Sequence, residues 1–377
     1  MTPETWFLLG IIAFWTLLYA ISRIFHLEKH GLEVRPAYFM FRSKLMKNVL
    51  ERISQSRQVF WKTLANIGIV IAFGIMIFCI YFLANNLLSF SIPVGEASPV
   101  VPILPGITLS LNWLPYFFAA LTIIVITHEF AHGIAARIEK IPIKSAGIMA
   151  ALVFFGGFVE PDGEKMEKAS KFSKLRIIAA GSSTNFVTYL LVTLLLIGLF
   201  VPSSGILIQG VTENGPAAKA GIQQWDVVYA INGTPVLTVD DFPQYMLNHT
   251  IMPGQNLTFS TYRGNIPITA GTNPSGNLSF GISGSNYYPL RILEISPMVT
   301  FNVHTFLYWF LLISGSVAIL NMLPLYPFDG EKFVYYSLEN IVKKGLSEIR
   351  IFYNVVCFCL IALNIALTLV NYGLIPI

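Results

Sequence analysis

The sequence predicts an α-helical polytopic membrane protein of about six transmembrane helices, with one β-rich domain inserted outside the membrane. Three observations predict this fold. The 377 residues are 54% hydrophobic and only 12% charged, whereas a soluble domain carries about 25% charged residues. Apolar runs long enough to cross a bilayer recur along the chain. Residues 202–290 are instead rich in Gly, Asn, Ser, Thr and Pro, and their apolar runs have strand length.

Six apolar segments have the roughly 20 residues that a membrane-spanning helix needs. They are residues 5–22, 63–91, 113–136, 175–201, 299–325 and 351–374. A further run, from Ala146 to Val159, has about 14 residues and contains a Gly-Gly pair, so it is too short to span. We expect it to form a re-entrant or interfacial segment that protein or a wet cavity covers.

The segments divide the chain into four predicted regions. An N-terminal region with two spans and a basic loop covers residues 1–112, and the inserted domain covers residues 202–290. The membrane core consists of two parts, residues 113–201 and residues 291–377. The first part contains the apolar run with Gly-Gly, and the second contains the last span.

Lysine and arginine residues are concentrated in alternate loops, and this pattern sets the expected orientation. Residues 22–62 hold nine of them, residues 137–176 hold eight and residues 326–350 hold four, whereas residues 92–112 hold none and residues 202–298 hold three. We therefore expect the basic loops in the cytoplasm, and both termini and the inserted domain outside. Because the first basic loop joins two spans and contains aromatic residues, we expect it to contact the lipid bilayer and no nucleic acid.

The third span contains two histidines and a glutamate in the run LTIIVITHEFAHGI. His128 and His132 are four residues apart and share one face of a helix. Two imidazoles at this spacing suit zinc, and the intervening Glu129 is placed to act as general base on a zinc-bound water. A chance cluster is disfavoured because each polar group in a membrane span is costly.

A zinc site of this type needs a third protein ligand and one open position. Asp329 follows the fifth span in LNMLPLYPFDGEKF, on the cytoplasmic side and at a suitable depth. At 1.5 Å per residue, His128 and Asn185 both lie roughly 14 Å from the cytoplasmic ends of their spans. The other four histidines are expected to be structural or solvated: His26, His30, His249 and His304.

Three motifs together resemble the site-2 protease family of intramembrane zinc metalloproteases. They are HEFAH, GSSTN and NMLPLYPFDG, and FFGGFVEP resembles the family's membrane-embedded hairpin. Phe328 replaces a leucine of the family pattern and Ser182 replaces a proline. The resemblance covers roughly residues 113–201 and 299–335.

The resemblance implies a role for each matching residue. His128, His132 and Asp329 would bind one Zn²⁺ per chain, and Glu129 would activate water. Asn185 would hold or polarise the scissile carbonyl. The substrate would be a transmembrane helix of another protein, locally unwound and cut near the cytoplasmic face of a prokaryotic cell membrane. The hairpin would offer an edge strand to that substrate.

The inserted domain resembles a PDZ domain of the type associated with bacterial proteases. The resemblance rests on GILIQGVTENGPAAKAGIQQWDVVYAINGTPV. It implies that Gly205–Ile208 receives a peptide C-terminus by strand addition, that NGPAAKAGI contains a short helix, and that strands and a turn follow. The domain is expected either to bind such a peptide or to exclude substrates with bulky external parts.

Two other functions compete with the intramembrane zinc endopeptidase. A membrane metal transporter also places polar residues in its spans, but here they gather near one face. An inactive scaffold would use the PDZ-like domain only for binding, and such a protein has no need of Glu129 as a general base.

The predicted orientation is tested by labelling from outside the cell. A cysteine introduced at Asn277 should react with a membrane-impermeant thiol reagent, and one introduced at Lys168 should react only after permeabilisation. The variants are compared with the unmodified protein, because its three cysteines lie in apolar runs. The reverse labelling pattern would overturn the orientation.

Overall fold

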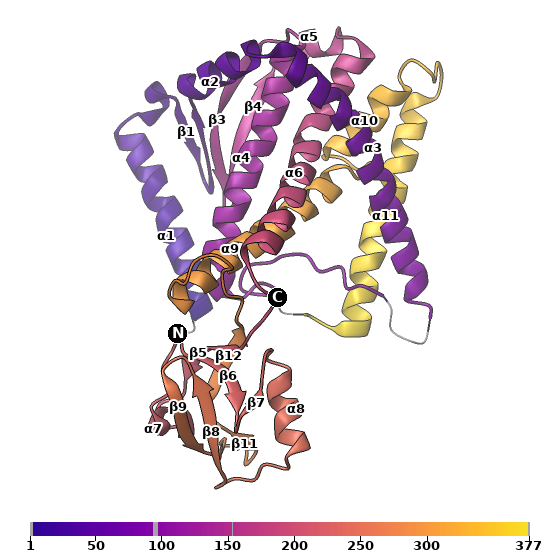
Figure 1. Ribbon diagram of the computed structural model, residues 1–377. Coiled ribbons are helices and arrows are strands. Elements are labelled where there is room, and N and C mark those ends of the chain that lie inside the picture. Colours follow the sequence, from indigo (N-terminus) through magenta and orange to yellow (C-terminus); the bar gives the residue numbers. More distant parts are fainter. Residues whose placement is uncertain (1–2, 93–96, 153, 376–377) are drawn as a thin grey trace. The chain divides into compact units, whose positions relative to one another are not determined.

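The computed structural model of the chain describes residues 3–92, 97–152 and 154–375 (Figure 1). The chain divides into two compact units. The first comprises Met1–Leu191 and Trp309–Ile377, and the second comprises Val192–Tyr308. Helices dominate the first unit, which also has a small sheet, and strands dominate the second. The predicted inserted domain, residues 202–290, lies within the second unit.

Five long helices in the described part of the chain are apolar enough to cross a membrane. They are α3 (Gln58–Ser89), α4 (Leu114–Ile138, preceded by the 3-10 turn η2, Leu111–Trp113), α6 (Lys171–Leu199), α9 (Pro297–Asn321) and α11 (Leu346–Tyr372). Five predicted spans are thus confirmed as long apolar helices. The other predicted span falls on α1 (Pro3–Ile24), whose apolar part, Leu8–Ile24, is shorter. Because a span needs about 20 apolar residues, the sixth span stays a prediction.

Short helices complete the first unit and close its core. They are η1 (Leu27–His30), α2 (Lys44–Gln55), α5 (Gly163–Glu167) and α10 (Asp329–Leu338). Leu50 of α2 and Phe333 of α10 are fully buried in one apolar cluster with Ile177 of α6 and Ala136 of α4. This cluster packs together the same helices that carry the predicted site residues.

The first unit contains an antiparallel sheet with strand order β1-β2-β3-β4. The strands are β1 (Leu32–Arg35), β2 (Tyr38–Arg42), β3 (Ile143–Ala151) and β4 (Phe154–Pro161). The predicted re-entrant segment is therefore the hairpin β3–β4. The sequence did not predict β1 and β2, which come from the first basic loop. Strand β1 alternates apolar and charged residues over only four positions, and β2 is a run of only five residues, so both patterns are too short to distinguish from loop.

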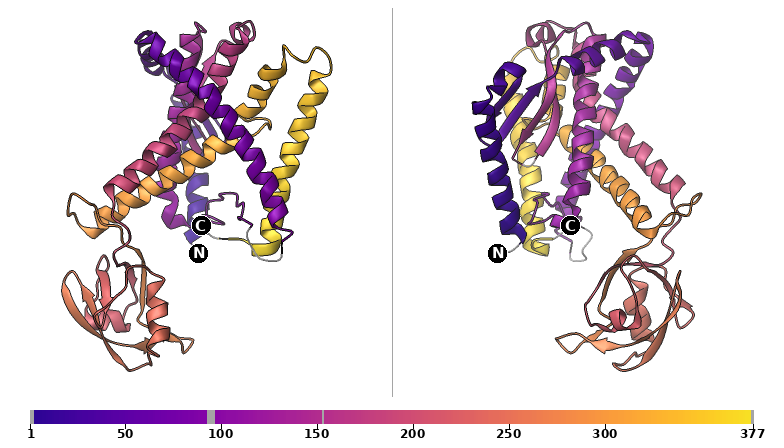
Figure 2. Two further views of the ribbon diagram at one scale, coloured as in Figure 1. Left: turned by 45° about the vertical axis from the view of Figure 1, so that its right-hand side comes forward. Right: turned by 90° about the vertical axis from the view of Figure 1, so that its left-hand side faces the viewer.

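Strand β4 is an outer strand of this sheet and lies along helix α4 (Figures 1 and 2). A Cβ atom at Gly156 would lie only 2.8 Å from Cγ1 of Val125 on α4. The Gly-Gly pair therefore allows the strand backbone to rest directly on the helix. At the turn of the hairpin, Trp15 Nε1 of α1 donates a hydrogen bond of 2.8 Å to the carbonyl oxygen of Leu152.

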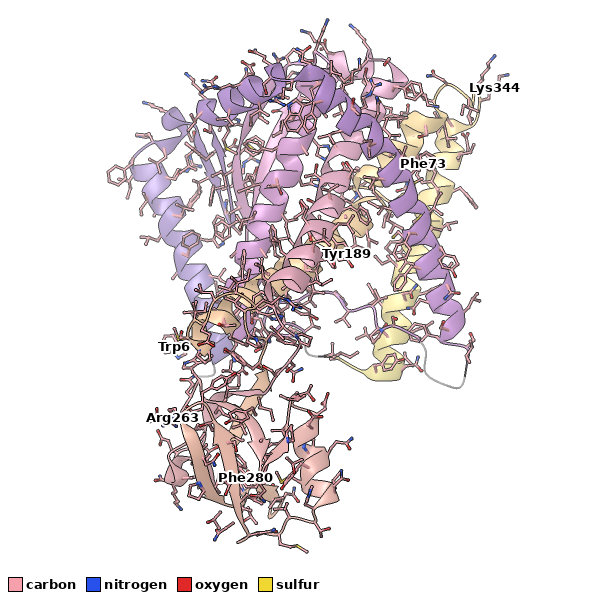
Figure 3. The ribbon with its side chains drawn as sticks, viewed as in Figure 1. Trp6, Phe73, Tyr189, Arg263, Phe280 and Lys344 are labelled. Carbon is pink, nitrogen blue, oxygen red and sulfur yellow. The ribbon has the colours of Figure 1, made fainter. Side chains whose placement is uncertain are left out.

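The second unit is built on an antiparallel sheet with strand order β12-β5-β6-β8-β9. The strands are β5 (Ile206–Val211), β6 (Val227–Ile231), β7 (Thr234–Pro235, paired with β6), β8 (Asn256–Thr261), β9 (Gly264–Thr269), the separate pair β10 (Gly271–Thr272) and β11 (Leu278–Ser279), and β12 (Ile282–Asn286). Helices α7 (Pro216–Ala220) and α8 (Asp241–Asn248) accompany them. Helix α7 confirms the short helix predicted in NGPAAKAGI. Phe259 and Phe280 are buried in the core, with ring centroids 5.4 Å apart; Phe280 is labelled in Figure 3.

The predicted peptide-binding strand of this unit is wrong. Gly205–Ile208 leads into β5, which is paired on both sides: Ile206 lies opposite Asn286 of β12 and opposite Val228 of β6. A strand with two hydrogen-bonded neighbours has no free edge to offer a peptide. Among the described residues, β12 and β9 end the main strand order of this sheet, and the two-residue strand β7 also has a single neighbour, β6.

Candidate metal centre

Helix α4 brings the two histidines of the HEFAH motif to one face. The helix runs unbroken from Leu114 to Ile138 and has Pro115 in its first turn, where a proline costs no hydrogen bond. Residues four apart then stack on one side, so the rings of His128 and His132 meet at a centroid distance of 4.7 Å. Both residues are buried, with exposed fractions of 5% and 9%.

Asp329 reaches the histidines because the chain reverses after α9. It is the first residue of α10. A Cβ atom on the next residue, Gly330, would lie 2.3 Å from the carbonyl oxygen of Met322 at the end of α9. Only glycine allows so close an approach of two backbone segments. The reversal brings Asp329 Oδ2 to 3.1 Å from His132 Nε2 and 3.2 Å from His128 Nε2.

The three predicted ligand atoms form a nearly equilateral triangle. The third side, from His132 Nε2 to His128 Nε2, measures 3.1 Å. In tetrahedral zinc sites the ligand atoms lie 2.0–2.2 Å from the ion, so two ligands are separated by about 3.3 Å. The sides of the triangle match this separation, and two imidazoles with one carboxylate are a common zinc ligand set. Among the described residues, this is the group of His, Cys, Asp and Glu side chains that could hold a metal ion.

The outer nitrogens of both rings also have partners, and these fix how the rings are presented. His132 Nδ1 lies 2.6 Å from the carbonyl oxygen of Ile177 on α6. Because a carbonyl only accepts, Nδ1 carries the proton and Nε2 is left with a free lone pair. A backbone acceptor on the outer nitrogen is the usual partner of a metal-binding histidine.

Asn185 of α6 lies against the outer nitrogen of His128. Its side chain is fully buried, and Nδ2 lies 3.0 Å from His128 Nδ1. Asn185 Oδ1 is buried without a hydrogen-bond partner in the described structure. If His128 binds a metal through Nε2, its Nδ1 is a donor, so the amide must turn over and present Oδ1 to it. One end of the amide then holds His128, and the NH₂ group takes the buried position that Oδ1 occupies here without a hydrogen-bond partner.

Glu129 lies beside the triangle and is not part of it. Its Oε2 accepts a hydrogen bond of 3.3 Å from the backbone N–H of Val159 on β4. The side chain is half-buried. The carboxylate that is predicted to act as general base therefore touches the outer strand of the hairpin.

Asn321 is a site residue that the sequence reasoning missed. It ends α9, and its Nδ2 lies 3.4 Å from His128 Nε2. The only sequence signal was its place as the first residue of the NMLPLYPFDG motif. Its amide adds a hydrogen-bond donor next to the face of the triangle.

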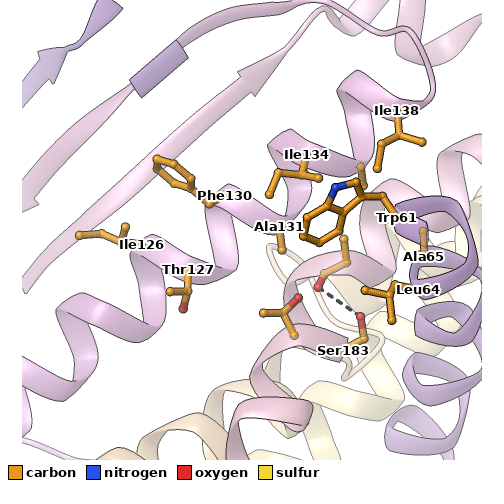
Figure 4. A pocket seen from close by; sticks show the side chains of 13 residues that line it. Trp61, Leu64, Ala65, Ile126, Thr127, Phe130, Ala131, Ile134, Ile138 and Ser183 are labelled. Carbon is orange, nitrogen blue, oxygen red and sulfur yellow. Dashed lines mark hydrogen bonds between the residues drawn. The ribbon is translucent and has the colours of Figure 1, made fainter. Parts of the chain in front are cut away.

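A cavity of about 390 Å³ between α3, α4 and α6 contains none of the predicted site residues (Figure 4). Its lining includes Trp61 of α3, Thr127 and Ala131 of α4, and Ser183 and Thr184 of α6. Thr127 and Ala131 each stand one residue before a histidine of α4, and so lie about 100° around the helix from the face that carries both histidines. The cavity therefore borders helices of the metal centre but contains none of its predicted residues.

The sequence matches a family profile and several known proteins. The profile described as Peptidase family M50 matches residues 116–367. An uncharacterised protein of Methanocaldococcus jannaschii is 29% identical over 330 residues, covering 86% of this chain and 82% of that protein. A zinc metalloprotease of Bacillus licheniformis is 26% identical over 138 residues, covering 35% of this chain and 32% of its own.

A PDZ domain of known structure is similar to about a fifth of the chain. The PDZ domain of an SdrC-like protein from Listeria monocytogenes is 20% identical and aligns with a TM-score of 0.20, covering 22% of this chain and 90% of that domain. The profile match spans more than half of the chain and both segments of the metal centre. The chain therefore belongs to Peptidase family M50, the site-2 protease family.

Proposed function

We propose that this protein is a zinc endopeptidase that hydrolyses peptide bonds in or near transmembrane helices of other membrane proteins. The observation that carries the proposal is the triangle of His128, His132 and Asp329 with the carboxylate of Glu129 beside it. The three ligands would hold one Zn²⁺. When bound there, zinc supplies the acidity that activates a water molecule and polarises a carbonyl group.

The chain's own residues would then move the proton. Glu129 takes a proton from the attacking water while the water oxygen bonds to the scissile carbonyl carbon. When the C–N bond breaks, Glu129 gives that proton to the leaving amine. We propose two tasks for Asn185: its Oδ1 orients His128, and its NH₂ group donates to the scissile carbonyl oxygen. The burial of Asn185 and its contact with His128 support the first task.

The outer strand β4 is the proposed docking site for the unwound substrate. A helix must lose its internal hydrogen bonds before its peptide bond can reach a catalytic group, and an edge strand replaces those bonds by strand addition. Strand β4 is an outer strand and touches Glu129 through Val159. A segment paired with β4 would thus lie next to the proposed general base.

We propose that both termini and the second unit lie outside a prokaryotic cell membrane, and that the metal centre lies near its cytoplasmic face. The support is the alternation of basic and neutral loops. The site needs water, which a short channel from the cytoplasm can supply.

The second unit would control which substrates gain access. It connects α6, which carries Asn185, to α9, which leads to Asp329. Either it captures a peptide C-terminus or it excludes bulky external domains. For peptide capture we propose the outer strand β12 in place of β5. Phe280 lies just before β12. Its ring packs against the ring of Phe242 in α8 with the centroids 5.7 Å apart, so a helix flanks the start of this strand.

Two alternatives are less well supported. A metal transporter needs successive sites along a path, yet the described residues contain a single group that could hold a metal ion. An inactive scaffold leaves the presence of Glu129 beside the ligands unexplained.

The first test separates metal binding from proton transfer. Asp329→Ala should lose most of its zinc, whereas Glu129→Gln should keep it. Glu129→Gln should lower cleavage of a transmembrane substrate by about 10²- to 10⁴-fold, since no base remains to take the proton. Zinc is measured by elemental analysis of the detergent-purified protein, and cleavage by gel. Full zinc content in Asp329→Ala would reject this ligand, and near-normal cleavage by Glu129→Gln would reject the base.

Two glycines of α6 give a matched steric test. A Cβ atom at Gly181 would lie 2.4 Å from His132 Nε2 and 2.5 Å from His128 Cε1, whereas one at Gly198 would have nothing within 4 Å. We expect Gly181→Ala to displace the rings and lose most of its zinc. Gly198→Ala should keep its zinc and change stability by no more than about 1 kcal/mol. Equal zinc content in both variants would show that the rings do not bind the ion in this arrangement.

The two tasks of Asn185 can be separated by two substitutions. Asn185→Asp keeps an acceptor for His128 and removes the NH₂ donor, so it should retain zinc and lose cleavage. Asn185→Ala removes both groups and should also weaken zinc binding, by about 10-fold or more. Normal cleavage by Asn185→Asp would reject the donor task, and wild-type zinc affinity in Asn185→Ala would reject the orienting task.

A further inference from the structure

Glu331 is a buried carboxylate two residues after Asp329. Its exposed fraction is 1%, and it lies in the first turn of α10. Removing a carboxylate from water is costly unless it is paired and fully hydrogen-bonded. No contact links Glu331 to the three ligand atoms, so the metal centre itself does not explain why a charge is buried here.

The partners of Glu331 come from one turn of α11. Arg350 Nε donates to Glu331 Oε1, and Arg350 Nη2 donates to Oε2 at 3.1 Å, so the guanidinium holds both oxygens. The hydroxyl of Tyr353 donates to Oε1 at 3.1 Å and also lies 3.2 Å from the backbone oxygen of Glu331. Side chain and backbone of the same residue are thus fixed to α11.

The same turn of α11 also binds Tyr326, at the start of the loop that leads to Glu331. Asn354 Oδ1 accepts a hydrogen bond of 2.7 Å from the backbone N–H of Tyr326. Asn354 Nδ2 donates to the carbonyl oxygen of Arg350 at 2.8 Å, which fixes the direction of the amide. The segment from Tyr326 to Glu331 is therefore attached to α11 at both ends, and Asp329 lies between the two attachments.

On its other side, the segment from Tyr326 to Glu331 packs against the residues that directly follow α9. Gly330 is packed against the carbonyl oxygens of Met322 and Leu323, where a Cβ would lie at 2.3 Å and 2.6 Å. The loop is thus held between the end of α9 and α11. A shift of α11 against α9 would move Asp329 relative to the histidines on α4.

We propose that Glu331, Arg350 and Tyr353 form a positioning clamp that sets the place of the Asp329 carboxylate at the metal centre. The inference rests on the proposed function, in which Asp329 is a zinc ligand. A buried ion pair adds little net stability compared with apolar residues of similar size, because desolvation offsets the attraction. Its bidentate geometry does, however, fix the relative position of two elements. The clamp therefore acts through geometry, and its three residues do not touch the substrate.

The main test replaces the ion pair by apolar residues. The double variant Glu331→Leu/Arg350→Leu leaves no uncompensated charge, so the protein should fold with a thermal midpoint close to that of the wild type. Its zinc affinity, measured by competition with a chelator of known affinity, should fall about 10- to 100-fold, as for other groups that orient metal ligands. Arg350→Lys keeps the charge but not the fork, and it should lose less affinity than the double variant.

A buried polar residue at the other end of α11 supplies the matched control. Asn364 is fully buried, receives a hydrogen bond of 2.8 Å from Asn86 Nδ2 and donates to the carbonyl oxygen of Leu83. Asn364→Leu should lower the thermal midpoint and leave zinc affinity unchanged. Wild-type zinc affinity in the double variant, or equal loss of affinity in Asn364→Leu, would overturn the clamp.

Two further variants keep the result interpretable. If the double variant does not fold, Tyr353→Phe, which removes only one hydroxyl, should still weaken zinc binding several-fold, and unchanged affinity would reject the clamp. Asp329→Ala distinguishes a failure of the proposed zinc ligand set from a failure of the clamp. If this variant retains its zinc, the proposed ligand set fails. If it loses zinc while the clamp variants bind normally, only the clamp fails.

Discussion

The meeting of three side chains that could hold a metal ion, between apolar helices, is the constraint on which the rest of the structure depends. Three polar atoms that lie 3.1–3.2 Å apart leave little space for bulky neighbours around them, so adjacent segments must be small or already bonded. Helix α6 meets the rings with Gly181, and the chain passes the end of α9 with Gly330. The outer nitrogens of the rings, which would be costly to bury unpaired, are taken by Ile177 and Asn185.

Charged residues at one end of the same helices hold this arrangement together. Arg176 of α6 pairs with Glu139, which caps α4, at 3.0 Å. Lys174 of α6, only 4% exposed, pairs with Glu339, which caps α10, at 3.0 Å. The loop charges that indicate orientation in the sequence thus also join the three helices that bear the metal centre. Breaking one partner of such a buried pair is costly because the other charge remains.

The sequence predicted the parts of the site that depend on short spacing. His128, Glu129 and His132 follow from one helical turn, and the motif that contains Asp329 completes the group of possible ligands. The strands β1 and β2 could not be predicted, because β3, the strand that ties β2 into the sheet, lies about a hundred residues later in the chain, and β1 joins the sheet only through β2. Glu331 and Arg350 are 19 residues apart and lie on different helices, so no helical spacing rule could pair them.

The error on the second unit has a related cause. A sequence pattern that is typical of a strand does not tell whether that strand lies inside a sheet or at its edge. Strand β5 has the expected apolar residues, but it receives β12 from the far end of the unit as a second neighbour. Register and neighbours are decided by tertiary contacts, which local propensity does not contain.

The four-stranded sheet of the first unit combines two strands from inside the residues that the family profile matches with two strands from outside them. Strands β3 and β4 lie within the residues that the family profile matches, whereas β1, β2 and helix α1 precede them. A hairpin of two strands is only marginally ordered by itself, and added strands stabilise it. Here the N-terminal region supplies those strands, and Trp15 holds the turn. The outer strand is therefore preorganised: its conformational entropy is lost when the protein folds, and an incoming chain that pairs with it does not have to order it again.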